Sequence, residues 1–298
     1  MSTGPGRAQS QAQLTTLGQV TAVIVNYNSG PWLARCIRAL KGKGARVPRV
    51  IVVDNASSDD SLYNLPPMPA TDIVRSPENL GFGRGVNFVL DRINTPYLLV
   101  INPDCLLVPE GLHALVEDME AHEQAGMVSG RIYDMGGNEQ RGSRRQLPGP
   151  RRVLNEVMRF RMGPAIDLTH LPAPSEPGEV EAVSGACMLI RTAAFRRLGG
   201  FDAGFPMHFE DLDLMARLLA DGWKIRLLPD VAISHAGGVS SRQRPVRVMI
   251  NKHRGLWRYL NKHCKDRWPP WVRPFWWFGI WLHVLLMLPV VSWRSYRN

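Results

Sequence analysis

Side chains that could hold a divalent cation follow two apolar stretches of the sequence. Asp104 ends the tripeptide Asn102-Pro103-Asp104, where a carboxylate beside an amide can ligate a hard cation through oxygen. The same three residue types favour a plain turn, so the tripeptide by itself fits either structure. His235 follows the second stretch, and its place near an acidic cluster favours a ligand over the structural role of most lone histidines.

Three acidic residues, Glu210, Asp211 and Asp213, stand within four positions at the start of a predicted amphipathic helix. Acids in a first turn complement the helix dipole, by about 0.3–1 kcal/mol each. That role needs one or two acids, whereas here three are clustered beside aromatic residues. A carboxylate at such a helix start can also act as a general base, so this cluster is the candidate for proton transfer.

Apolar stretches that alternate with amphipathic ones predict the elements that carry these residues. In the first half we expect strands at 20–25, 49–53, 72–75 and 97–101, and helices at 31–40, from residue 59, and at 85–93. This alternation is typical of an α/β doubly wound sheet with helices on both faces, whose ligand lies at the carboxyl ends of the strands. Polar clusters at 26–28, 54–58 and 102–104 all follow strands, so we expect them to meet at one rim. In the second half we expect strands at 182–191, 224–228 and 231–235 and a helix at 212–220.

Residues 136–177 differ from the rest because they are rich in Gly, Pro and Arg. We predict a mobile excursion with a short helix at 153–160. Its seven arginines lie within 141–161 with only Glu156 as an acid among them, which leaves the segment self-repelling without an anionic partner. The hypothesis is that it orders over the active site, where Arg144 and Arg145 bind a diphosphate. A solvated loop is the alternative.

The basic excess of the chain lies at its C-terminal end. The formal net charge is +10, and residues 242–298 contain 12 Lys or Arg and one acid. Residues 245–263 predict a basic amphipathic helix that inserts Leu256, Trp257 and Leu260 into a membrane interface. Residues 275–293 carry no formal charge and are borderline between an in-plane and a spanning helix. We expect this segment to hold the protein, as a peripheral or monotopic one, on the cytoplasmic face of the cell membrane.

The ends and the cysteines add two expectations. Residues 1–18 are small and polar, and we predict a disordered arm without a secretory signal. Four cysteines without any CxxC spacing fit buried thiols in a reducing compartment.

Six stretches in order resemble the family 2 glycosyltransferases with the GT-A fold, in the rhamnosyltransferase-like branch of cell-wall and lipopolysaccharide assembly. The matching segments are VIVNYNSGPWLARCIRAL (from Val23), VVDNASSDDS (from Val52), NLGFGRGVN (from Asn79), LLVINPDC (from Leu98), VSGACMLIRTAAFRRLGGFDAGFPMHFEDLDLMARL (from Val183) and ISHAGG (from Ile233). The resemblance implies a GT-A catalytic domain at 19–241, with a nucleotide-sugar-binding half at 19–120 and an acceptor half at 180–241. Residues 242–298 would form the membrane-associating segment.

The resemblance also implies roles for single residues. The positions that hold the donor nucleotide are Asn26, Tyr27, Asn28, Asp54 and Asn55, and those along its ribose and diphosphate are Asn79, Gly81, Gly83, Arg84, Asn102 and Asp104. Asp104 matches the metal-binding aspartate of a D-x-D motif whose first acid is replaced here by Asn102. Asp211 matches the catalytic base and His235 a second metal ligand. The acceptor would meet Glu210, Trp257, Arg144 and Arg145.

Elementary chemistry agrees with these roles. An inverting transfer needs a base for the acceptor hydroxyl and a cation, Mg²⁺ or Mn²⁺, on the departing diphosphate. The expected donor is dTDP-rhamnose, with UDP-galactofuranose, UDP-glucose and UDP-N-acetylglucosamine as alternatives. The expected acceptor is a lipid-linked saccharide. The pattern predicts no oligomeric state.

Other classes of function fit less well. The glycines at 81, 83 and 85 suggest a dinucleotide fingerprint, but Val86 stands where its last glycine belongs. A nucleic-acid-binding protein would explain the basic end, yet that end continues into an uncharged stretch rich in Trp, which suits a membrane better. We therefore expect no nucleic-acid partner. A catalytically inactive sugar-binding relative is the third alternative, against which Asp104, Asp211 and His235 argue.

Overall fold

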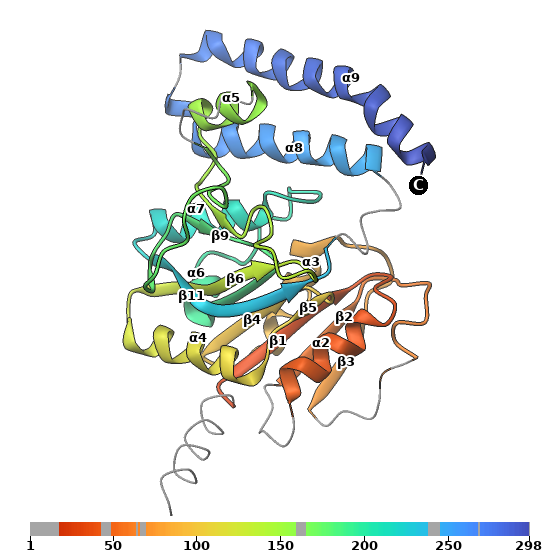
Figure 1. Cartoon of the computed structure of the whole chain (residues 1–298), viewed down its shortest axis with the longest axis vertical. Coiled ribbons are helices and arrows are strands. Elements are labelled where there is room, and N and C mark those ends of the chain that lie inside the picture. The colour runs from red at the N-terminus through yellow and green to blue at the C-terminus, as the bar shows by residue number, and fades with distance from the viewer. Residues whose placement is uncertain are drawn as a thin grey trace, which may run out of the picture.

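A nine-stranded mixed β-sheet runs through the centre of the molecule in the computed structural model, which describes residues 18–42, 49–63, 65, 70–158, 165–237, 245–267 and 269–297 (Figure 1). Its first half consists of parallel strands in the order β3-β2-β1-β4. These strands are β1 (Val20–Asn26), β2 (Arg49–Asp54), β3 (Thr71–Arg75) and β4 (Tyr97–Ile101). The predicted doubly wound half-sheet is therefore present, with its carboxyl ends at one rim.

The second half of the sheet mixes strand directions. β10 lies antiparallel between β4 and β6, and β11 runs parallel to β6 and antiparallel to β5 and β8. The strands are β5 (Cys105–Leu106), β6 (Ala125–Tyr133), β8 (Gly178–Glu179), β10 (Cys187–Arg191) and β11 (Lys224–His235). A separate two-stranded sheet pairs β7 (Arg144–Arg145) with β9 (Ala182–Val183).

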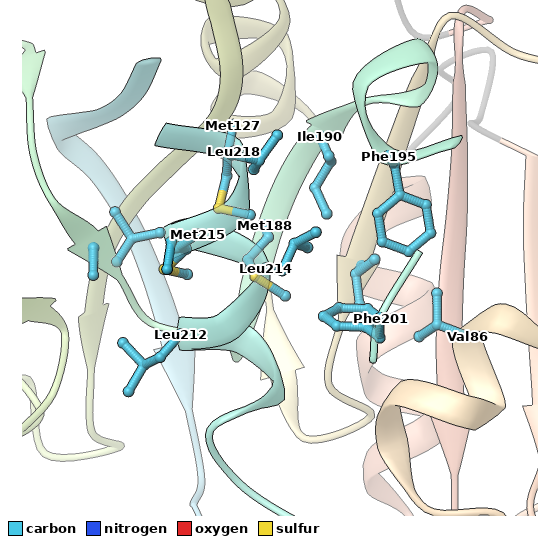
Figure 2. Close-up of a cluster of buried hydrophobic side chains, with 14 of the residues drawn as sticks. Val86, Met127, Met188, Ile190, Phe195, Phe201, Leu212, Leu214, Met215 and Leu218 are labelled. Atoms are coloured by element: carbon cyan, nitrogen blue, oxygen red, sulfur yellow. The ribbon is translucent and has the colours of Figure 1, made fainter. Parts of the chain in front are cut away.

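Helices cover both faces of the large sheet, because its strands β1, β2, β4 and β10 are apolar and buried along almost their whole length. One face packs against α2 (Trp32–Lys41) and α4 (Pro109–Ala121). The other packs against α3 (Phe82–Asn87), α6 (Thr192–Arg197), α7 (Glu210–Ala220) and α8 (Pro245–His263). Figure 2 shows this second core, where Leu214 and Met215 of α7 meet Met188 of β10. The core fixes the orientation of α7, whose first turn carries the acidic cluster.

Several predicted elements differ in detail from the structure. The short helix expected from residue 59 is a turn, and the helix expected at 85–93 is α3 followed by the 3-10 turn Leu90–Arg92. The single strand expected at 182–191 is divided into β9 and β10. The two strands expected at 224–235 are one strand, β11, because a bulge between Leu228 and Ala232 keeps both parts paired with β6.

Residues 136–177 are more ordered than predicted wherever the structure describes them. They contain β7 and α5 (Pro150–Met158), and acids inside and outside the segment pair with their arginines. Arg144 pairs with Glu139, Arg145 with Asp211 and Arg152 with Glu181. The expectation of a self-repelling segment was wrong because two of these acids are distant in sequence. Residues 159–164 and the expected arm, except for residue 18, lie outside the described part.

The C-terminal segment divides into two helices with different surroundings. Tyr259 and Leu260 of α8 are buried in the core beside α7, and Arg258 and Lys262 form ion pairs with Asp202. The prediction that α8 inserts Leu256, Trp257 and Leu260 into a membrane was wrong, because this apolar face packs on the protein instead. α9 (Arg273–Arg297) follows, and much of its apolar surface is exposed.

Candidate active site

The carboxyl ends of β1 and β2 form one polar corner of the sheet. Asn26 and Asp54 are paired in the strand register, and Nδ2 of Asn26 donates to Oδ1 of Asp54 at 3.3 Å. The same amide donates to two serine hydroxyls, those of Ser57 and Ser61. Asn26 and Asp54 are buried, whereas Tyr27 and Asn28 beside them are half-buried. The buried pair therefore shapes the corner, and the two half-buried residues leave part of their surface open to a ligand.

The loop after β3 is attached to this corner by Asn55. Its Oδ1 accepts from the backbone N–H of Leu80 at 2.9 Å, and its Nδ2 donates to Oδ1 of Asn79 and to the carbonyl of Gly81. Gly81 has φ +79°, a left-handed conformation that suits glycine. Arg84 is exposed and donates through Nε to the Leu80 carbonyl. The loop is thus held in place, while the Arg84 guanidinium that follows it is exposed to solvent.

Two other glycines of this loop serve helix packing. A Cβ on Gly83 would lie 3.0 Å from Cβ of Phe201, and one on Gly85 would lie 3.0 Å from Cγ1 of Val25. Both are buried, so they allow α3 to pack closely on β1 and on residue 201. This packing explains the glycine spacing without a dinucleotide fingerprint.

Asp104 and His235 meet where β4 and β11 end. Nε2 of His235 lies 3.2 Å from Oδ1 of Asp104, and Nδ1 of His235 lies 2.7 Å from Oε1 of Gln140. The Gln140 side-chain oxygen can only accept a hydrogen bond, so the imidazole carries its hydrogen on Nδ1. The lone pair of Nε2 then faces a carboxylate, an arrangement that a shared cation stabilises.

Three possible ligand atoms gather here, from Asp104, Cys105 and His235, all within 4.8 Å of one another. Burial raises the pKa of the Cys105 thiol well above its ordinary value, and Sγ donates to the carbonyl of Ala186. The thiol is thus engaged as a donor to that carbonyl, and sulfur is a poorer ligand than oxygen for a hard cation. The remaining carboxylate and imidazole fit Mn²⁺ better than Mg²⁺, which strongly prefers oxygen ligands.

The first turn of α7 presents two acids in opposite protonation states. Nη2 of Arg145 donates to Oδ2 of Asp211 at 2.5 Å. Burial acts to raise the pKa of Asp211, but the Arg145 charge and hydrogen bond outweigh it and hold this pKa below its ordinary value. Burial, and then the neighbouring Asp211 charge, raise the pKa of Glu210 to about 8. Near neutral pH, Asp211 is thus ionised and able to accept a proton, whereas Glu210 is protonated.

The backbone that leads into α7 is strained. His208 and Phe209 have φ values of 63° and 71°, which non-glycine residues rarely adopt. Such residues persist where the surrounding structure holds them, often at functional sites. Here His208 and Phe209 set the direction in which the side chains of Glu210 and Asp211 point.

One short loop, residues 184–186, connects the metal end of the site to the base end. A Cβ on Gly185 would lie 2.5 Å from Oδ2 of Asp211, so only glycine allows this approach. The next residue, Ala186, accepts at its carbonyl from the backbone N–H of Asn102 at 2.8 Å and from Sγ of Cys105. Asp211 and the segment 102–105 that carries Asp104 therefore both contact this loop. This juxtaposition also explains why the expected strand 182–191 is interrupted.

The other predicted site residues have structural surroundings. Asp213 is fully buried and pairs with Arg217, Lys262 and His263, so it is not a free base. Trp257 is half-buried and packs against the core from α8. Arg144 is also buried, and its guanidinium makes four hydrogen bonds, to Glu139 and to the carbonyls of residues 171 and 172. Those bonds argue against an acceptor role for Arg144, whereas Arg145 points into the site.

Replacing each of these adjacent arginines by alanine should separate a structural role from a functional one. Arg144→Ala removes the four hydrogen bonds of a buried guanidinium and leaves Glu139 with Arg131 alone, so we expect a loss of about 2 kcal/mol in the free energy of unfolding. Arg145→Ala should instead raise the acceptor KM about tenfold, more than the donor KM. Without the Arg145 charge the pKa of Asp211 rises, so the acid limb of the kcat/KM profile should move to higher pH. Denaturant unfolding and pH–rate profiles test both. Equal effects of the two variants on acceptor KM would contradict this division.

Sequence reasoning missed three residues of the site. Gln140 orients His235 from a loop without periodicity, and no sequence signal indicated it. Cys105 follows Asp104 directly and was interpreted only as a buried thiol. All four cysteines are indeed free and buried. His208 adjoins the acidic cluster, and burial lowers its pKa to about 4.

A sheet rim with a polar nucleotide corner, a carboxylate–histidine pair and a paired helix-start aspartate defines a glycosyltransferase of the GT-A type. Residues 21–199 match the family described as Glycosyl transferase family 2, and the chain belongs to this family. Solved structures support the fold. A mannosyltransferase from Pyrobaculum calidifontis, in complex with GDP-Man and Mn²⁺, aligns over 92% of this chain and 73% of its own, with TM-score 0.54 and 19% identity. GalNAc-T7 with UDP, GalNAc and Mn²⁺ aligns over 72% of this chain and 42% of its own, with TM-score 0.53 and 16% identity.

Curated relatives place the chain in the rhamnosyltransferase-like branch. It is 28% identical over 265 residues to the N-acetylglucosaminyl-diphospho-decaprenol L-rhamnosyltransferase of Mycobacterium tuberculosis, covering 83% of this chain and 85% of that protein. It is also 28% identical over 159 residues to rhamnosyltransferase WbbL of Escherichia coli, covering 50% of this chain and 58% of that one. The family and branch suggested by the sequence motifs are thus confirmed.

Proposed function

We propose that the protein transfers L-rhamnose from dTDP-rhamnose, with inversion, to a saccharide carried on a polyprenyl diphosphate. The contact of residues 184–186 with both Asp211 and the segment 102–105 that carries Asp104 supports the catalytic part of this proposal. The choice of sugar and acceptor rests on likeness to the mycobacterial relative along most of both chains.

The residues of the chain divide the work of a single in-line displacement. Asp211 accepts the proton of the attacking acceptor hydroxyl as the new glycosidic bond forms and the bond to the donor diphosphate breaks. Arg145 keeps this carboxylate ionised. An anionic group of the acceptor could then draw the Arg145 guanidinium away from Asp211. Asp104 and His235 would hold a divalent cation, which stabilises the negative charge of the departing nucleotide diphosphate when bound. The corner at Asn26 and Asp54, with Tyr27, would receive the nucleotide base.

A panel of nucleotide sugars tests the donor assignment. Thermal unfolding is measured with Mn²⁺ and dTDP-rhamnose, UDP-galactofuranose, UDP-glucose or UDP-N-acetylglucosamine, each at the same concentration. We expect the largest rise in Tm with dTDP-rhamnose. At equal concentrations, the ligand with the lowest Kd stabilises the folded state most. A larger rise with any UDP-sugar would replace rhamnose in the proposal.

α9 is the part of the chain that we propose to contact the cytoplasmic face of the membrane. The segment Pro270–Ser292 is long and apolar enough to cross a bilayer, and only 11% of its most apolar window is buried. Phe278 and Leu285 are each at least 60% exposed and, seven residues apart, lie on one face of the helix. An apolar surface of this kind is typical of a helix that lies in or across a membrane interface.

Polar substitutions on this surface test the membrane proposal without disturbing the core. The double variant Phe278→Gln, Leu285→Gln should bind anionic vesicles at least about tenfold more weakly. Donor affinity should not change, because these side chains face away from the sheet. Vesicle co-sedimentation at low salt measures the first quantity and thermal shift the second. Unchanged vesicle binding would exclude α9 as the anchor.

A further inference from the structure

An apolar groove lies between α5, α8 and α9, the three helices grouped beyond α7 in Figure 1. Its volume is about 320 Å³, at the lower end of the range of about 300–1,000 Å³ that ligand pockets occupy. Val153 and Leu154 line it from α5, Leu256 from α8, and Trp276 and Gly279 from α9. A partly open, apolar space of this kind fits a hydrocarbon chain rather than a sugar or a nucleotide.

We infer that this groove holds the first isoprene units of the acceptor's polyprenyl chain, while the acceptor diphosphate lies at Lys252 between the groove and Asp211. The inference rests on the proposed transfer to a polyprenyl-diphosphate saccharide and adds a separate site to it.

Close packing of α8 on the start of α7 joins the groove to the base. A Cβ on Gly255 would lie 3.0 Å from the carbonyl oxygen of His208, so α8 approaches the strained backbone before Glu210 directly. Leu256, the next residue, lines the groove. A hydrocarbon chain that contacts Leu256 therefore lies one residue along α8 from Gly255, where α8 touches the backbone that leads to Asp211.

Positive charge lies at this junction. Lys252 stands one turn before Leu256 on α8, and its charge lowers the pKa of His208, after the larger effect of burial. Among the residues that the structure describes, no acid lies within ion-pair distance of Lys252, while the charge of Arg141 adds to the effect of burial in lowering its pKa. Together with Arg145, these cations favour an anionic ligand beside the base. The diphosphate of a lipid-linked acceptor supplies this charge at the head of a hydrocarbon chain.

One face of α9 lines the groove, and the opposite face is exposed and apolar. Trp276, Gly279 and His283 recur at helical spacing and face the groove. Phe278 and Leu285 are exposed on the opposite, outward face. A bilayer against the outward surface would leave the groove at the membrane boundary, so the far end of the chain can remain in lipid.

Gly279 offers a direct test, because a Cβ there has nothing within 4 Å. Gly279→Phe should fill the groove without clashing with the protein, and Gly279→Ala is the matched control. Each variant is assayed with two acceptors that carry the same saccharide diphosphate, one on a decaprenyl chain and one on a methyl group. We expect Gly279→Phe to raise KM for the decaprenyl acceptor at least about tenfold, the effect of losing burial of two methylene groups. KM for the methyl acceptor and the donor should not change, and Gly279→Ala should behave as wild type.

A second variant guards against a folding defect. Leu154 lines the groove and is 49% exposed, so Leu154→Glu should fold and should also weaken only the decaprenyl acceptor. Equal effects on both acceptors, or none with either variant, would overturn the inference and leave the groove to bilayer acyl chains. If wild type transfers sugar to neither acceptor, the proposed function fails instead. Binding of sugar-free decaprenyl diphosphate, compared between wild type and Gly279→Phe, then decides the groove by itself.

Discussion

Asp211→Asn is expected to lower turnover by at least about 10²-fold, the low end for removal of a general base, while donor affinity is retained. Asn occupies nearly the same space and can still accept from Arg145, but it cannot take a proton from the acceptor hydroxyl. The acid is ionised in the wild type because Arg145 outweighs the cost of burial. Single-turnover transfer measures the loss, and calorimetric titration with dTDP-rhamnose and Mn²⁺ measures donor binding.

Glu210→Gln is the matched control, because Glu210 is the adjacent acid and is protonated near neutral pH. Burial and the Asp211 charge raise the pKa of Glu210 to about 8, so Gln resembles its dominant state. We expect this variant to keep most of the turnover. If Glu210→Gln abolishes transfer while Asp211→Asn retains it, the roles of the two acids must be exchanged.

Residues that follow strands were predictable from the sequence because sheet geometry is general. β4 has the predicted bounds, and Asp104 and His235 lie together at the rim because both follow strands of one sheet. Gln140, which fixes the tautomer of that histidine, lies in a loop without periodicity. The partner of a loop residue depends on how the whole chain folds, so its sequence position alone could not indicate it.

The C-terminal helices show a second limit of sequence reasoning. α8 has the predicted bounds, Pro245–His263, since helical periodicity is a local property. The periodicity shows that one face is apolar but does not say whether protein or lipid covers it. Lys262, a basic residue of this helix, pairs with Asp202, which follows α6, and with Asp213 in the first turn of α7. Long-range pairing of charges decided both this outcome and that of the Arg-rich segment.

Asp104→Ala is expected to lower turnover by about 10³-fold and to make donor affinity independent of Mn²⁺. A bound cation contributes several kcal/mol of charge stabilisation on the leaving diphosphate, and about 4 kcal/mol corresponds to this factor. Asp104 is the ionisable oxygen ligand of the pair, so without it His235 alone cannot hold a hard cation. Wild-type enzyme treated with EDTA should lose transfer to a similar extent and regain it with Mn²⁺ more fully than with Mg²⁺, because one ligand is an imidazole.

Gln140→Ala is the graded control for the same site. It leaves both ligands in place but removes the acceptor 2.7 Å from Nδ1 of His235, so the imidazole is no longer oriented. Loss of such a supporting hydrogen bond typically costs about 10- to 100-fold in metal affinity. We therefore expect Gln140→Ala to need more Mn²⁺ for half-maximal donor binding, with turnover recovered at saturating Mn²⁺, whereas Asp104→Ala should not recover. Metal-dependent donor binding that persists in Asp104→Ala would show that the cation is held elsewhere.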